Sequence, residues 1–181
     1  MDLFIDFSKV KIERLSKTHD TSKFDCGDPD INNFLKNDAI SWQERQIAVT
    51  MILHYNGEII GFFCSSADSI KLKEFEKKNE KGLNSKHIRA LPAVKIGRLG
   101  RSINHKRRGL GEFILKWSIG HIFAMTKHTG IYFVTVDAYP SRVGWYEQFG
   151  FKKNLHDDYQ NKDNVSMRLC IYNPLEESRQ N

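Results

Sequence analysis

Lys106-Arg107-Arg108-Gly109-Leu110-Gly111 is the stretch of sequence that decides the fold. It follows residues 93–99, an apolar run with the pattern of a strand. Beyond it, apolar residues recur every three or four positions from Leu110 to about Lys127, as on one face of a helix that Gly130 ends. A glycine-rich turn between a strand and a helix predicts an anion site, because the unpaired N–H groups and the dipole of the helix face the ligand.

Three cations, Lys106, Arg107 and Arg108, strengthen this anion site. A Walker A loop is excluded because no Gly-Lys-Ser/Thr follows, and a dinucleotide-binding loop is excluded because Ile114 takes the place of its third glycine. The turn therefore indicates a phosphate-bearing ligand of another class.

The segment after the helix completes a strand–helix–strand unit. Residues 131–138 are almost continuously apolar, as expected of an interior strand covered on both faces. Ser141 is expected to cap a short helix that carries Tyr146 and stops at Gly150 in the left-handed conformation. Residues 165–172 form the expected final strand.

The N-terminal half predicts a strand, a helix and a hairpin. Residues 10–15 alternate like a strand, and Asp28-Pro29 is a helix start followed by an apolar stripe that we expect in the core: Ile31, Phe34, Leu35, Ala39 and Trp42. Asn56-Gly57 is a tight turn between strands at residues 49–55 and 59–64. The charge-dense residues 71–89 predict a short surface helix and a loop, because acids and bases alternate along them.

Composition bounds the class of protein. The 181 residues are expected to form one domain, 1–181, with no membrane partner. The net charge of +6 fits either a polyanionic ligand or a generically basic protein. Three scattered cysteines, Cys26, Cys64 and Cys170, predict reduced thiols in the cytoplasm, and the spacing of the seven histidines predicts no metal site.

The turn at 106–111, together with Tyr146 and the following Gly150-Phe151, resembles the GNAT superfamily of N-acetyltransferases over roughly residues 93–153. The resemblance implies an α/β (α+β) fold: a mixed, mostly antiparallel central sheet flanked by helices around a βαβ core that binds acyl-CoA. Lys106 stands where the family has Gln or Arg. A lysine keeps the positive charge of an arginine but lacks its planar, forked guanidinium group.

The same resemblance assigns roles to residues for acetyl-CoA, the acetyl donor. Backbone amides from Arg107 through Arg108, Gly109 and Leu110 to Gly111 would hold the pyrophosphate, and the main chain of Leu99, Gly100 and Arg101 would pair with the pantetheine. Tyr146 would assist the leaving thiolate.

The tyrosine and the missing base constrain the chemistry. Full proton transfer from a phenol to a thiolate is uphill by about 2 kcal/mol, so Tyr146 is expected to donate a hydrogen bond unless nearby cations lower its pKa. Residues 94–99 offer only Lys95 and Arg98 and no carboxylate. Either water relays the amine's proton to an acid such as Asp137, or the amine arrives neutral, as an α-amine beside an ester does.

A second resemblance concerns the acceptor. Phe24-Asp25-Cys26-Gly27 with the following helix and hairpin resembles the GNAT toxins of bacterial toxin-antitoxin pairs. It implies the α-amine of aminoacyl-tRNA as acceptor and a small DNA-binding antitoxin as partner, and a homodimer is a further expectation. Gly100-Arg101-Ser102 and Ala138-Tyr139-Pro140 depart from the relatives' pattern. A small-molecule or protein amine, or a non-catalytic RNA- or partner-binding module on the same fold, therefore stays open.

Overall fold

The structure is a computed structural model that describes residues 5–80, 83, 88–106 and 109–172. The chain divides into two compact units, each built from two separate segments. Unit 1 comprises Met1–Ser66 and Ile96–His121, and unit 2 comprises Ala67–Lys95 and Ile122–Asn181. The expectation of one domain over residues 1–181 stays a prediction.

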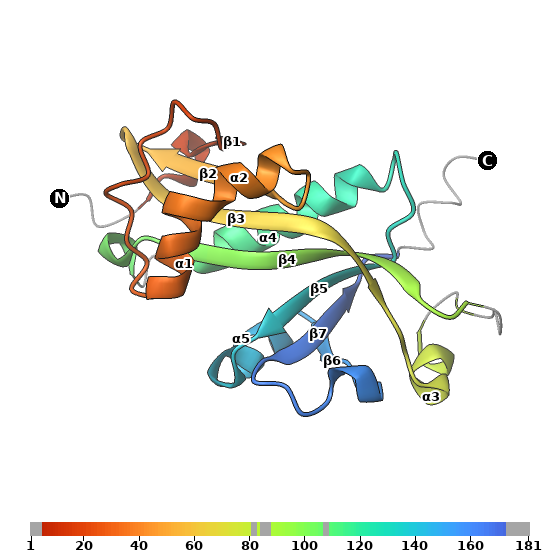
Figure 1. The fold of residues 1–181 in the computed structure, drawn as a ribbon. Coiled ribbons are helices and arrows are strands. Elements are labelled where there is room, and N and C mark those ends of the chain that lie inside the picture. Colours follow the sequence, from red (N-terminus) through yellow and green to blue (C-terminus); the bar gives the residue numbers. More distant parts are fainter. Residues whose placement is uncertain (1–4, 81–82, 84–87, 107–108, 173–181) are drawn as a thin grey trace. The chain divides into compact units, whose positions relative to one another are not determined.

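Unit 1 begins with a 3-10 turn (Phe7–Lys9) and three antiparallel strands, β1 (Lys11–Arg14), β2 (Val49–Tyr55) and β3 (Glu58–Ile70), the last of which continues into unit 2. The hairpin prediction is confirmed (Figure 1), because Tyr55 pairs with Glu58 across Asn56 and Gly57. Both turn residues have positive φ, 50° and 81°, as a tight hairpin turn requires.

The segment between β1 and β2 is helical, with an interruption that the sequence does not predict. Asp28 caps α1 (Pro29–Asn33) by accepting the N–H groups of Asp30 and Ile31 at 3.0 and 3.2 Å. A π-helical turn (Phe34–Asp38) then leads into α2 (Ala39–Glu44). The apolar stripe is confirmed as core: three of its members are buried and two pack against the same cluster, namely Phe34, Leu35, Ala39, Ile31 and Trp42.

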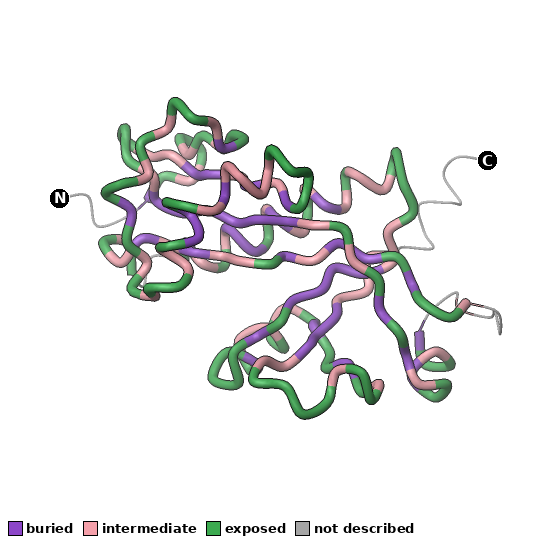
Figure 2. Tube along the Cα trace, in the orientation of Figure 1, coloured by how far each residue is buried: buried purple, intermediate pink, exposed green. Residues whose placement is uncertain are grey.

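The βαβ core consists of β4 (Leu91–Arg101), α4 (Leu110–Met125) and β5 (Phe133–Ala138), with a 3-10 turn (Ile103–His105) between β4 and α4. β4 and β5 are parallel, which confirms the expected unit. α4 ends two residues before the expected Lys127 and buries one stripe of side chains: Leu110, Ile114, Leu115, Ser118 and Ile122. β5 is buried except at Asp137, as an interior strand should be (Figure 2).

The rest of unit 2 consists of short elements around β5. These are α3 (Glu74–Lys78), a 3-10 turn (Pro140–Arg142), α5 (Val143–Glu147), β6 (Lys152–Lys153), a 3-10 turn (Asp157–Tyr159) and β7 (Val165–Cys170). The seven described strands follow the order β1-β2-β3-β4-β5-β7-β6. β1 with β2, β2 with β3, β5 with β7 and β6 with β7 pair antiparallel, and β4 with β5 pairs parallel. The mixed, mostly antiparallel sheet is confirmed.

The expected cap of the second short helix is wrong. Ser141 lies inside the 3-10 turn, and the N-cap position of α5 is Arg142, which makes no side-chain capping bond. Pro140 starts that turn two residues before the position at which a serine cap would start it, so Ser141 already lies within the turn. The left-handed stop at Gly150 is confirmed by its φ of 87°.

The charge-dense segment is more than a surface helix. Glu76 and Glu80 are buried and both bind Arg168 of β7, at 2.8 and 2.9 Å. Arg168 also donates to the carbonyl of Lys153 and to Asn154. This acid–arginine cluster fastens α3 and its flank to β7 within unit 2.

Among the described residues, no helix has both the length and the apolar character needed to cross a bilayer.

We expect Arg168→Met to destabilise the protein by about 3–5 kcal/mol, because it leaves two buried carboxylates without their counter-ion. Lys71→Met is the matched control: it removes a pair with Asp158 in which both side chains are about half exposed, and should cost below about 1 kcal/mol. Urea unfolding measures both. Equal losses would contradict the role of the buried cluster.

Candidate functional site

The end of β4 is packed closely within unit 1. A Cβ on Gly100 would lie 2.6 Å from Cε1 of Phe62, and one on Gly61 would lie 2.5 Å from Cδ1 of Ile114 and 3.1 Å from the carbonyl oxygen of Gly100. Ser102 N–H donates to the carbonyl of Ile60 at 2.8 Å. Only glycines allow β3, β4 and α4 to come this close, so the main chain around Gly100 is held in a defined position.

The predicted pantetheine-binding residues lie beyond the pairing of β4 with β5. That parallel register covers Ala93, Val94 and Lys95. Leu99, Gly100 and Arg101 follow it along β4 and are not part of this register. Among the described residues, these three positions thus lie outside the β4–β5 pairing, as the predicted pairing with an extended ligand requires.

The turn before α4 has the geometry that an anion site needs. Gly109 has a φ of 72° and is exposed, and its carbonyl accepts the N–H of Phe113 at 2.9 Å, which starts the helix. Leu110 is buried and Gly111 is half-buried, so the first turn is anchored by its apolar side. The first N–H groups of a helix have no acceptor within the helix, which leaves them for a ligand. With 16 residues, α4 is long enough for a full helix dipole.

The cations of this turn are only partly described. Lys106 is exposed and directly follows the 3-10 turn, as its C-cap residue. Arg107 and Arg108 lie outside the described residues. Among the described residues of this turn, Lys106 therefore supplies the positive charge next to the start of α4.

Tyr146 lies in α5 of unit 2 within an aromatic group. Its ring centroid is 4.9 Å from that of Trp145 and 5.4 Å from that of Phe151, both in edge-on arrangements. Burial raises the pKa of Tyr146, and the charge of Arg142 offsets this only in part. In the part of the chain that the structure describes, burial therefore outweighs the neighbouring cation, which is the opposite direction to the alternative in which cations lower the pKa of Tyr146.

Arg98 and Lys95 lie on the strand where a carboxylate base would be expected, and both cations interact with other side chains. In unit 1, the guanidinium carbon of Arg98 lies 4.4 Å from the centre of the Phe34 ring and 5.3 Å from that of Trp42. In unit 2, Lys95 Nζ lies 2.8 Å from Asp137 and 3.8 Å from Asp68. Neither cation is a base, and Asp137 is already in an ion pair.

Asp68 is a charged residue of this region that the sequence reasoning missed. Its carboxylate accepts a hydrogen bond from the hydroxyl of Thr135 at 2.5 Å and faces Lys95. No sequence pattern indicates this contact, because Asp68 and Thr135 come together only when strands that are distant in the sequence assemble into the sheet.

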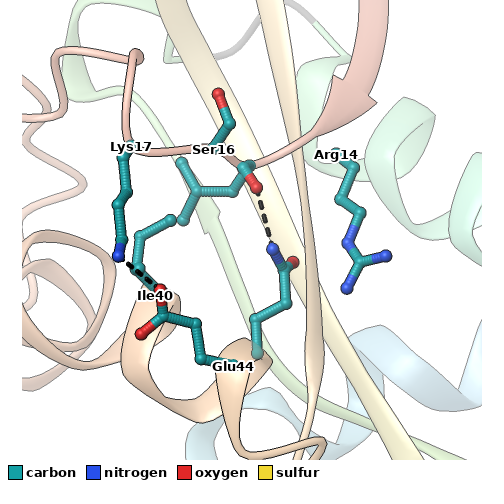
Figure 3. Close-up of a pocket in the computed structure, with 7 residues that line it drawn as sticks. Arg14, Ser16, Lys17, Ile40 and Glu44 are labelled. Atoms are coloured by element: carbon teal, nitrogen blue, oxygen red, sulfur yellow. Dashed lines mark hydrogen bonds and ion pairs between the residues drawn. The ribbon is translucent and has the colours of Figure 1, made fainter.

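A hollow of about 420 Å³ opens between the end of β1 and α2 (Figure 3). The amide of Gln43 donates to the carbonyl of Leu15 at 2.9 Å, and Lys17 pairs with Glu44 across it. It contains none of the residues that the sequence assigns to the site. Gln43 also accepts the N–H of Thr50 in β2. Its side chain therefore connects α2 to two other segments and has a structural role.

Two solved toxin structures match most of the chain. AtaT complexed with acetyl-methionyl-tRNAfMet matches with a TM-score of 0.73 and 18% identity, over 94% of this chain and 98% of that one. A tyrosine-to-phenylalanine mutant of AtaT, bound to the C-terminus of the antitoxin AtaR and acetyl-CoA, matches with a TM-score of 0.70 and 17% identity, over 90% and 93%. The fold is that of the GNAT toxins.

The sequence comparisons agree with this GNAT-toxin fold. A curated tRNA-acetylating toxin of Mycobacterium tuberculosis (strain ATCC 25618 / H37Rv) is 20% identical over 140 residues, which are 77% of this chain and 82% of the relative. No family model matches the chain.

We expect Gly109→Ala to lower the free energy of unfolding by about 1 kcal/mol, because an L-residue is strained at the left-handed φ of this position. Gly120→Ala is the control. It lies in α4, where an added Cβ meets nothing within 4 Å, and should raise stability by up to about 1 kcal/mol. If urea unfolding gave the two variants the same sign, the backbone geometry of the turn would be contradicted.

Proposed function

We propose that this protein is an acetyl-CoA-dependent N-acetyltransferase that transfers an acetyl group to a primary amine. The observation that carries the proposal is the exposed left-handed turn at Gly109, which opens the first turn of α4 at the end of β4 in a GNAT-toxin fold. This is the place where a diphosphate gains most from main-chain N–H groups and the helix dipole.

The residues present fit acetyl-CoA. Main-chain amides from Arg107 to Gly111 bind the pyrophosphate, with Lys106 adding charge and with Arg107 and Arg108 contributing as the sequence predicts. The main chain of Leu99, Gly100 and Arg101, beyond the β4–β5 register, pairs with the pantetheine. Side chains at these three positions are then free to vary, because the pairing uses backbone groups alone.

The chemistry is attack of a neutral amine on the thioester carbonyl. The C–N bond forms, the C–S bond breaks, and a main-chain N–H near Leu99–Arg101 stabilises the oxyanion between the two steps. The nitrogen releases one proton, which passes through water to the departing sulfur, so that coenzyme A leaves as the thiol. The phenol of Tyr146, whose raised pKa keeps it protonated, donates a hydrogen bond to the leaving sulfur. The amine must arrive neutral, because Lys95 and Arg98 offer no base on β4.

The acceptor we propose is the α-amine of aminoacyl-tRNA in the cytoplasm. The ester beside that amine makes it less basic than a lysine side chain, which matches the absence of a base on residues 94–99. The net charge of +6 favours a polyanionic acceptor. The tRNA-acetylating relative, and AtaT with its acetylated tRNA, support the same class. A small DNA-binding antitoxin is the partner we propose, by analogy with AtaR.

Tyr146→Phe should lower turnover by about 10²-fold and leave acetyl-CoA affinity unchanged, because it removes only the donor to the leaving sulfur. Steady-state turnover with a charged tRNA and calorimetry with acetyl-CoA measure the two quantities. Tyr159→Phe is the control, since that phenol accepts the N–H of Lys71 and should not alter turnover. Near-normal turnover in Tyr146→Phe would remove Tyr146 from the mechanism.

Incubation with labelled acetyl-CoA and a panel of acceptors tests the substrate. We expect label on aminoacyl-tRNA and none on the same tRNAs after deacylation, because the amine belongs to the amino acid. Free polyamines and peptides are the comparison arm. Labelling of these with none on charged tRNA would replace the proposed acceptor by a small-molecule or protein amine, and no acetyl-CoA binding at millimolar levels would refute the enzyme assignment itself.

A further inference from the structure

Three potential metal ligands meet in unit 1 at the edge of the sheet. Glu13 lies on β1, His54 lies on β2, and His19 lies in the loop that follows β1. The strand register places Glu13 opposite Ile52 and Lys11 opposite His54, so Glu13 and His54 are diagonal neighbours. The loop brings in His19, whose Nδ1 accepts the N–H of Ser16 at 2.9 Å.

The ligand atoms have the separations of a coordination site. Glu13 Oε1 lies 3.5 Å from His19 Nε2 and 3.4 Å from His54 Nε2, and all three ligand atoms lie within 4.8 Å of one another. These distances exceed the usual hydrogen-bond range of about 2.7–3.2 Å. Two ligands bonded at about 2.0–2.1 Å to one tetrahedral ion lie about 3.3 Å apart. The two distances from Glu13 match the second geometry.

His54 supplies an independent observation. Its Nε2 is buried and makes no hydrogen bond within the described part of the chain. A buried polar nitrogen without a partner is costly, and a bound ion would satisfy it.

We propose that Glu13, His19 and His54 form a binding site for a transition-metal ion, with Zn²⁺ as its occupant. Two imidazoles and one carboxylate are a ligand set that suits zinc, whereas Mg²⁺ and Ca²⁺ require oxygen ligands throughout. Water takes the fourth position. The ion joins β1, the loop after it and β2.

Ser16 lies beside the ligand His19. Its N–H donates to Nδ1 of His19 at 2.9 Å, and its hydroxyl oxygen is also 2.9 Å from Nδ1. Ser16 therefore holds one ring nitrogen in place, and the other, Nε2, faces Glu13 and the proposed ion.

Calorimetry with ZnCl₂ on the full-length, EDTA-treated protein tests the site. We expect saturable binding of a single ion per chain, and a loss of affinity of about 100-fold or more in the double variant His19→Gln/His54→Gln. His156→Gln is the matched control, because His156 also faces a carboxylate, Asp158, at 3.6 Å, but without a third ligand. Its affinity should equal that of the wild type.

Two further measurements keep the test decisive if the double variant folds poorly. Glu13→Gln changes an exposed carboxylate and should keep the circular dichroism spectrum while lowering zinc affinity about tenfold. Co²⁺ bound to the wild type should give the intense visible absorption of a four-coordinate ion. Unsaturable zinc binding, unchanged affinity in the folded variants, or a weak six-coordinate cobalt spectrum would each overturn the site, and none of them bears on acetyl transfer.

Discussion

The close contact between β3, β4 and α4 at two glycines is the constraint on which unit 1 depends. At Gly61 and Gly100 a single added carbon would meet Ile114, Phe62 or backbone within 3.1 Å. This contact holds the end of β4 against the helix that starts at Leu110. It thereby places the main chain proposed to pair with pantetheine and the turn proposed to bind phosphate on one rigid support. Both parts of the proposed coenzyme site thereby derive from packing, not from charged side chains.

Local signals predicted most of the elements. Asn56-Gly57 forms the turn of the predicted hairpin, and Asp28-Pro29 starts the predicted helix. Both predictions succeed because these residues favour a particular local backbone conformation by themselves. The π turn at Phe34–Asp38 and the uncapped start of α5 were not predictable in this way. The π turn buries Phe34 and Leu35 in the core, which a rule of helical spacing does not describe. α5 follows directly on the 3-10 turn that Pro140 starts.

Long-range pairing accounts for what the sequence did not reveal about charged residues. Glu76 and Glu80 belong to an alternating charge run, which is typical of a solvated surface, yet Arg168 from the last strand buries them. Glu13, His19 and His54 have no ligand spacing along the chain and meet only across the β1–β2 register. The sequence predicted that Tyr146 lies on a short helix, but the direction in which its pKa shifts depends on its burial in the folded protein.

The aromatic stack between Phe7 and Phe113, with ring centroids 4.4 Å apart, connects the amino-terminal segment to the first turn of α4. The Phe7 ring also approaches the backbone at Gly109, where an added Cβ would lie 3.9 Å from it. A tag or fusion partner attached ahead of this ring would therefore be anchored beside the turn proposed to bind the coenzyme phosphates. For biochemical work, a carboxy-terminal tag is the better choice for preserving native coenzyme affinity.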